Sequence, residues 1–265
     1  MEDRAFQREL TGKVAIVTGA TQGLGEAVAR EFAARGIRAL LITGRNAARG
    51  DAVAESLRGA GCEVLFQAAD LSDLAAVRQI VPAAEEAFGR LDILVNAAGD
   101  TDRGSITETT PELYERIMAV NLRAPFFLIR DAAEAMQRQG TEGAIVNIQS
   151  MSGHGGQPFL AAYSVSKGAL AALTKNAAYG LLKHRIRVNG LNIGWMATPG
   201  EDAIMKLRHG AEDDWLTQAA AAQPFGRLLD PREVAKAVAY LASGESGLMT
   251  GANIDFDQNI LGARD

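Results

Sequence analysis

Residues 13–27 read KVAIVTGATQGLGEA, an apolar run that passes directly into a glycine-rich turn. The β-branched and apolar residues 13–18 predict a buried strand, and the alanine-rich stretch after the turn has the spacing of a helix. Gly19, Gly23 and Gly25 let a phosphate approach the main chain closely, and the N-terminus of the following helix attracts a pyrophosphate. The spacing matches neither the general GxGxxG fingerprint nor a P-loop. A tight turn without a ligand is the alternative interpretation.

The same alternation of short apolar runs and longer alanine-rich stretches continues along the chain. Continuous apolar strands separated by helices predict a parallel sheet that helices cover on both faces. Pro111 is expected to open a helix, because its missing N–H costs nothing in the first turn. Six further runs are expected to be strands: RALLIT (38–43), CEVLFQ (62–67), LDILVN (91–96), GAIVNI (143–148), RIRVNGL (185–191) and ANIDF (252–256).

The composition is that of one soluble domain. The chain has 265 residues, is 48% hydrophobic and carries a net charge of −5 without runs of like charge, so we predict no nucleic-acid or membrane partner. We expect an N-terminal extension, 1–10, and a single α/β domain, 11–265. The extension lacks the apolar core of a secretory signal, and the single cysteine, Cys62, fits a reducing compartment. These features predict a cytoplasmic protein. Three scattered histidines and the lack of a GxSxG elbow give no support for a zinc site or a hydrolase.

Residues 196–224 interrupt the alternation of strands and helices. This segment carries Pro199, Gly200 and an acidic helical patch. An excursion of this length near the carboxyl ends of the strands predicts a substrate lid.

Tyr163 and Lys167 lie four residues apart in AAYSVSKGAL (161–170). On a helix, these two side chains share one face. The ammonium favours the phenolate, and a neighbouring positive charge lowers a pKa by about 1–3 units. The phenol would then come closer to the range in which a general acid–base group works at neutral pH. A surface helix with two amphipathic side chains is the alternative interpretation.

The glycine turn TGATQGLG resembles that of the short-chain dehydrogenase/reductase family, in its classical subgroup, and the resemblance covers residues 11–257. NAAG (96–99), Asn121, Ser150, the YxxxK pair and the segment 187–198 follow in the order and spacing of the family. The resemblance implies a Rossmann-type doubly wound parallel sheet of about seven strands with helices on both faces. It also implies an NAD(P)(H)-dependent oxidoreductase that interconverts a secondary alcohol and a carbonyl.

The resemblance assigns roles to four catalytic residues. Tyr163 is the general acid–base group, and Lys167 also holds the nicotinamide ribose. Ser150 orients the substrate oxygen, and Asn121 anchors a water that links Lys167 to solvent. For Ser150 and Asn121, capping or turn formation is the alternative. The residues that the resemblance implies for cofactor binding are Gly19, Thr21, Gln22, Gly23, Leu24, Gly25, Arg45, Asp70, Leu71, Asn96, Ala97, Ala98, Gly99, Tyr163, Lys167, Ile193 and Thr198.

The end of the second strand, LLITGRN, bears on the choice of cofactor. Gly44 occupies the position at which an NAD-dependent family member would carry Asp, and Arg45 follows it. A guanidinium pairs with a 2′-phosphate, so we predict a preference for NADP(H), with NAD(H) as the alternative. Against this preference, Gln22 stands where many NADP-dependent relatives carry a second basic residue. Asp70 is expected either to lie near the adenine or to cap a helix that starts around Ser72.

Two segments depart from the family pattern. Ile193-Gly194 replaces Pro-Gly, which restores a backbone N–H in the loop. At the end of the chain, DFDQN and the tail ILGARD replace Asp-Gly-Gly. The tail could pack on a neighbouring subunit, because the family commonly forms tetramers. We therefore expect a homo-oligomer, either a tetramer or a dimer.

The positions beside the catalytic residues predict the substrate pocket. Aromatic residues make up only 6% of the chain and the lid is acidic, which favours a small sugar, polyol or similar polar alcohol or carbonyl over a steroid. A 3-oxoacyl thioester reductase and a hydroxysteroid-type dehydrogenase are the alternative enzymes. A catalytically silent NADP(H)-sensing protein is the non-enzymatic alternative, although such relatives typically lack the Tyr or the Lys. The residues expected to line the pocket are Ser150, Met151, His154, Gln157, Tyr163, Trp195 and Met196.

Overall fold

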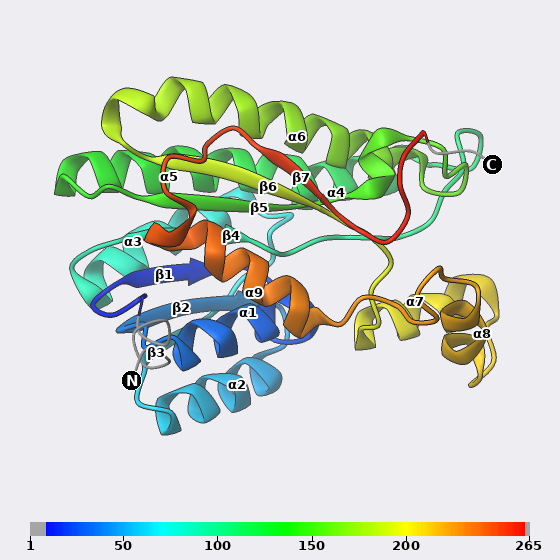
Figure 1. Ribbon diagram of the computed structural model, residues 1–265, viewed down its shortest axis with the longest axis horizontal. Coiled ribbons are helices and arrows are strands. Elements are labelled where there is room, and N and C mark those ends of the chain that lie inside the picture. Colours follow the sequence, from blue (N-terminus) through cyan, green and yellow to red (C-terminus); the bar gives the residue numbers. More distant parts are fainter. Residues whose placement is uncertain (1–8, 263–265) are drawn as a thin grey trace.

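The structure is a computed structural model that describes residues 9–262, and its strands form one parallel sheet (Figure 1). The order is β3-β2-β1-β4-β5-β6-β7, so the direction of winding reverses between β1 and β4. In such sheets, ligands bind outside the carboxyl ends of the strands at the point of reversal. The strands are β1 (Val14–Val17), β2 (Ala39–Gly44), β3 (Glu63–Ala68), β4 (Ile93–Asn96), β5 (Ala144–Ser150), β6 (Arg187–Ile193) and β7 (Asn253–Phe256).

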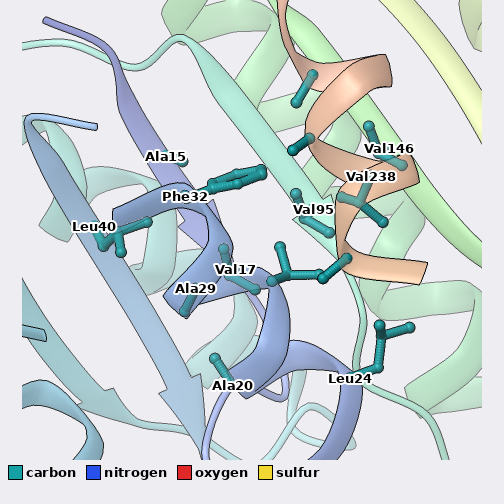
Figure 2. Close-up of a cluster of buried hydrophobic side chains, with 14 of the residues drawn as sticks. Ala15, Val17, Ala20, Leu24, Ala29, Phe32, Leu40, Val95, Val146 and Val238 are labelled. Atoms are coloured by element: carbon teal, nitrogen blue, oxygen red, sulfur yellow. The ribbon is translucent and has the colours of Figure 1, made fainter. Parts of the chain in front are cut away.

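Helices cover both faces of the sheet, because the strand side chains are apolar on both sides. In β1, Ala15 and Val17 belong to one buried cluster and Ile16 to the other. The first cluster includes Phe32 and Val238, which Figure 2 shows with side chains of the central strands. Its helices are α1 (Gly23–Ala34), α2 (Ala47–Gly59) and α9 (Pro231–Ala242). The helices of the second cluster are α3 (Leu74–Phe88), α5 (Ala124–Gln139) and α6 (Ala161–Leu181).

One helical connection contains a π-turn at a position that matters for the site. Helix α4 (Pro111–Met118) continues through the π-helix η3 (Ala119–Arg123) into α5. Pro111 stands in the first turn of α4, as predicted, and the hydroxyl of Thr110 caps the helix. Short 3-10 turns occur at η4 (Met151–His154), η5 (Leu182–His184) and η6 (Gly244–Ser246).

The segment 196–224 forms two helices beyond the carboxyl ends of the strands (Figure 1). These helices are α7 (Pro199–His209) and α8 (Trp215–Ala221). They have a small apolar cluster of their own around Trp215, separate from the two clusters of the sheet. Apart from Met196, which belongs to the first cluster of the sheet, the segment therefore depends little on the main core.

The predicted sheet is confirmed: all seven predicted strands are present, with ends within two residues of those observed. The helix expected to start around Ser72 instead begins at Leu74, and Asp73 is its N-cap. Leu10, which we assigned to the extension, is only 1% exposed and belongs to the first core cluster. Residues 1–8 of the extension and 263–265 of the tail lie outside the described residues. Among the helices of residues 9–262, none is long and apolar enough to cross a membrane.

Candidate active site

A cleft of about 310 Å³ lies at the carboxyl ends of the strands, where the sheet order reverses. The segments after β1, β2, β3 and β4 line it, together with the ends of β5 and β6. Asn96 is not part of this lining, because its side chain is buried and donates to Asn147 Oδ1 at 2.8 Å. The other residues expected to bind a cofactor all line the cleft: Gly19, Thr21, Gln22, Gly23, Leu24, Gly25, Arg45, Asp70, Leu71, Ala97, Ala98, Gly99, Tyr163, Lys167, Ile193 and Thr198.

The glycine turn has the backbone that its sequence requires. Gly19 and Gly23 have φ angles of +67° and +58°, which other residues rarely adopt. A Cβ on Gly25 would lie 2.3 Å from the Gly19 carbonyl oxygen, so α1 packs directly on the turn. Gln22 is the N-cap of α1, and its side chain makes no capping hydrogen bond. The first N–H groups of α1 are therefore available to an anion in the cleft.

The loop after β4 is fastened to this turn. The Thr18 hydroxyl accepts hydrogen bonds from the backbone N–H groups of Ala97 and Ala98, each at 3.1 Å. A Cβ on Gly19 would lie 2.7 Å from the Ala98 Cα, so only glycine fits between the two segments. The two walls of the cleft are thus held at a fixed separation.

The end of β2 presents cations and no carboxylate at its edge of the cleft. Arg45 is exposed and lines the cleft beside Gly44. A Cβ on Gly44 would lie 2.4 Å from Thr21 Cγ2, so an Asp at this position would displace Thr21. Arg49, at the start of α2, donates a short hydrogen bond to the Gln22 side chain and also lines the cleft. Sequence analysis did not identify Arg49.

Asp70 lines the cleft but does not cap α3. Its carboxylate accepts hydrogen bonds from the Ser72 backbone N–H at 2.9 Å and from the Ser72 hydroxyl at 2.8 Å. These two bonds, and more weakly the charge of Arg45, hold the pKa of Asp70 below its usual value. Asp70 therefore forms a local turn at the mouth of the cleft.

Helix α6 brings Tyr163 and Lys167 to one side of the cleft. Both side chains are buried, and Lys167 Nζ lies 5.7 Å from the centroid of the Tyr163 ring. The ammonium donates a hydrogen bond to the Ile148 carbonyl on β5 at 2.8 Å. Of the two interpretations of the YxxxK pair, the surface helix is excluded, because neither side chain is exposed.

Burial is the largest influence on the pKa values of both groups. It raises the pKa of Tyr163, whereas a hydrogen bond with Ser150 lowers it. It lowers the pKa of Lys167 to about 8. The pKa of Tyr163 in the protein alone is thus raised, in contrast to the lowering expected from Lys167. The expectation considered the charge of the ammonium and omitted the cost of burying a phenolate.

Ser150 and Asn121 approach the same pair from two other elements. Ser150 ends β5 beside Tyr163, and its hydroxyl accepts a hydrogen bond from the Ser152 backbone N–H at 3.1 Å. Asn121 lies in η3, fully buried, and both ends of its amide bond the backbone of Asp100. A Cβ on Gly99 would lie 3.7 Å from Asn121 Oδ1 and 3.8 Å from Lys167 Nζ, so these two atoms border one small space.

The residues expected to contact substrate do not all face the cleft. Met196 lines it, whereas His154 bonds Asp255 of β7 at 3.1 Å. Gln157 is exposed and accepts a short hydrogen bond from the Ser152 hydroxyl. Trp195 donates from Nε1 to the Glu201 carboxylate at 3.0 Å. Met151 is half-buried in η4. Of the seven residues, only Tyr163 and Met196 are among those that line the cleft, and substrate contact by all seven stays a prediction.

Charged residues that the sequence did not single out surround the end of the cleft near Tyr163. Arg103 donates to Glu201 at 3.0 Å, and Arg116 bridges Asp100 and Asp102 at 2.8 and 2.7 Å. Asp100 follows the NAAG segment directly, which is a signal that could have identified it. The Arg103–Glu201 pair has no such signal, because its members are 98 positions apart. In residues 9–262, no group of His, Cys, Asp and Glu side chains could hold a metal ion.

Comparison with known proteins shows similarity along nearly the whole chain. A family profile described as enoyl-(acyl carrier protein) reductase matches residues 19–258. An NADP-dependent (R)-specific alcohol dehydrogenase of Lentilactobacillus kefiri is 37% identical over 94% of this chain and 96% of its own length. A galactitol 2-dehydrogenase of Agrobacterium fabrum is 33% identical over 94% and 97%. A solved structure of a short-chain type dehydrogenase/reductase from Mycobacterium marinum has a TM-score of 0.86 at 30% identity, over 96% of this chain and 98% of that chain.

Proposed function

The chain belongs to the short-chain dehydrogenase/reductase family of oxidoreductases, and we propose that it interconverts a secondary alcohol and a carbonyl with NADP(H) as cofactor. The observation that carries this proposal is that Tyr163 and Lys167 line the cleft together and that Ser150 forms a hydrogen bond with Tyr163. A silent cofactor-binding protein would need Lys167 for the ribose, but it needs neither Tyr163 nor Ser150 in such a position.

The cleft fits a dinucleotide. The uncapped first turn of α1 suits a pyrophosphate, and the glycines of the turn leave its backbone open to close approach. Lys167 and the space beside Gly99 suit the nicotinamide ribose. When bound, the nicotinamide supplies the hydride donor or acceptor.

The residues of this chain would handle the proton. Tyr163 gives its phenolic proton to the carbonyl oxygen during reduction, or takes the hydroxyl proton during oxidation. Ser150 donates a hydrogen bond to the same substrate oxygen and steadies its negative charge. Lys167, with its pKa lowered to about 8, stays mostly cationic at neutral pH and favours the phenolate. Asn121 would hold the water through which the proton returns.

The cations at the end of β2 support NADP(H) over NAD(H). Arg45 and Arg49 both line this edge of the cleft, where a 2′-phosphate would lie. An Asp in place of Gly44, which would repel that phosphate, has no room beside Thr21. The relative from Lentilactobacillus kefiri is NADP-dependent by its name. Arg49 also adds a basic residue that compensates for Gln22.

The substrate that we propose is a small polar alcohol or carbonyl, such as a polyol or sugar. The charged residues near Tyr163 support it, and one relative is a galactitol dehydrogenase by name. We also propose that residues 196–224 act as a lid, because Met196, Thr198, Gly200 and Glu201 line the cleft while the two helices of the segment lie outside the main core.

The test is a cofactor absorbance assay over polyols, sugars, simple secondary alcohols, ketoacyl thioesters and steroids. With an active substrate, Tyr163→Phe should lower kcat/KM by about 10²–10⁴-fold and leave cofactor binding measurable by fluorescence titration. Tyr179→Phe is the matched control, because Tyr179 lies on the same helix and is 82% exposed. Near-normal activity of Tyr163→Phe would contradict the mechanism. Equal or better efficiency with NAD(H) at matched, subsaturating concentration would contradict the cofactor preference.

A further inference from the structure

Glu201 is held at the substrate end of the cleft by one backbone contact and two side-chain contacts. Its backbone N–H donates to the Thr198 hydroxyl at 3.1 Å, in the first turn of α7. Its carboxylate oxygen Oε1 accepts from Arg103 and from Trp195 Nε1, each at 3.0 Å. The Glu201 side chain is 15% exposed and that of Arg103 is 11% exposed, so the pair is largely removed from water.

The carboxylate faces the reacting end of the site. Glu201 lines the same cleft as Tyr163 and Lys167. Its negative charge raises the pKa of Tyr163 and the positive charge of Arg103 lowers it, although both effects are smaller than that of burial. A substrate whose oxygen meets Tyr163 would therefore bring its neighbouring atoms close to this ion pair.

Each of the three guanidinium nitrogens of Arg103 already donates a hydrogen bond to the protein. Its Nε donates to His209 Nε2 at 3.1 Å, its Nη1 to the Thr101 carbonyl and its Nη2 to Glu201. Glu201, in contrast, uses only Oε1 in the hydrogen bonds of residues 9–262, so Oε2 keeps its capacity to accept. A carboxylate oxygen that is free to accept, beside a guanidinium whose three nitrogens are already bonded to the protein, favours a substrate hydroxyl group and repels a carboxylate or phosphate.

We propose that Glu201 is a specificity residue that accepts a hydrogen bond from a hydroxyl adjacent to the reacting carbon, which makes neutral vicinal diols and α-hydroxyketones the preferred substrates. This inference rests on the proposed function and adds the substrate feature that this site recognises. Arg103 and Trp195 act as positioning residues, since they fix Oε1 and thereby aim Oε2.

The experiment compares three probe ketones in the reductive direction: acetoin, its methyl ether and butanone. Only acetoin can donate a hydroxyl proton to Glu201, so the wild-type protein should prefer it by about tenfold or more in kcat/KM. Glu201→Gln should reduce the ratio of acetoin to butanone by about tenfold. The ratio is the decisive readout, because a change in folding, lid position or Tyr163 pKa affects all three ketones alike.

The matched control is Glu212→Gln, since Glu212 is an exposed carboxylate in the same 196–224 segment. In this variant the ratio of kcat/KM for acetoin to that for butanone should equal the wild-type ratio. The methyl ether tests the inference on the wild-type protein alone, so a variant that fails to fold does not remove the test. A wild-type protein that turns over all three ketones equally, or a Glu201→Gln ratio that is unchanged, would overturn the inference and leave the proposed function standing. Activity on other alcohols or carbonyls without reduction of acetoin would overturn the inference alone, whereas no activity with either cofactor on the three ketones or on any substrate of the absorbance assay would contradict both.

Discussion

Lys167 carries a charge into a buried position at the wall of the cleft. It is 4% exposed, and burial lowers its pKa from 10.5 to about 8. Below about pH 8 both folded and unfolded protein hold the proton, so the folded state bears the full cost of the buried charge. Between about pH 8 and 10.5 the unfolded state binds more protons, and the free energy of unfolding rises with pH. The shift corresponds to about 3 kcal/mol at neutral pH.

The protein should become more stable when this lysine is replaced by a neutral side chain of similar length. Lys167→Met removes the buried charge but also the hydrogen bond to Ile148, so we expect a net gain of about 2 kcal/mol at pH 7. The gain should shrink by about 2 kcal/mol at pH 10. Urea unfolding of variant and wild type at both pH values checks this, with the exposed Lys175→Met as control. A gain that does not depend on pH would show that the ammonium is not the cause.

At the scale of single residues, the sequence predicted those site residues whose position depends only on their spacing within one helix or on their place at the end of one strand. Tyr163 and Lys167 share a helix face and line the cleft, and Ser150 ends a strand beside Tyr163, so their proximity follows from the predicted elements. The partners of Glu201 and the orientation of His154 toward Asp255 depend on loops whose course no periodicity describes. The same holds for the pKa of Tyr163, which depends on complete burial.

At the scale of elements, the strands and helices were predictable and their junctions were not. Asn121 reaches the site because η3 inserts a wider π-helical turn between two α-helices. Nothing in the sequence AVNLR predicts this π-helical turn. The acidic patch predicted a helix in 196–224, whereas the structure has two, with a small core around Trp215. Helix boundaries in such a segment depend on contacts with other loops.

Helix α7 is tied to the loop after β4 by ion pairs across the cleft. Arg208 contacts Asp102 at 2.7 Å, and the Asp102 side chain is 13% exposed. Burial alone would raise the pKa of Asp102, but the hydrogen bond from Arg208, with other bonds and charges, holds it below its usual value. The pair therefore persists at neutral pH and is lost only as the pH falls through that lowered pKa.

Breaking this contact should loosen the 196–224 segment. We expect Arg208→Gln to raise KM for cofactor and ketone by about three- to tenfold, since a charge-assisted hydrogen bond is worth about 1.5–3 kcal/mol before solvent screening. Lys206→Gln is the control, because Lys206 pairs with Asp202 and Asp213 inside the segment. Steady-state kinetics at low and high salt measure both variants. An equal effect of the two substitutions would contradict a tie across the cleft.

At the scale of the whole molecule, the outer face of α5 and α6 has an apolar surface that residues 9–262 leave exposed. The two helices lie side by side along one edge (Figure 1). Phe126 of α5 is 49% exposed, and Val165 and Tyr179 of α6 are 57% and 82% exposed. Val165 and Tyr179 are two heptads apart, so they lie on one face of the helix. Exposed apolar patches of this kind commonly mark association surfaces.

We therefore predict that the protein associates through this face in solution. Light scattering coupled to size-exclusion chromatography should give a mass of two or more times the 28.0 kDa of one chain. The double variant Val165→Asp, Tyr179→Asp should lower that mass, because two carboxylates would have to be buried in the interface. Ile106→Asp is the control, since Ile106 is 85% exposed in a loop. The prediction would be contradicted if the wild-type protein had the mass of a single chain, or if the double variant had the same mass as the wild type. In either case the apolar surface of α5 and α6 would not form an interface.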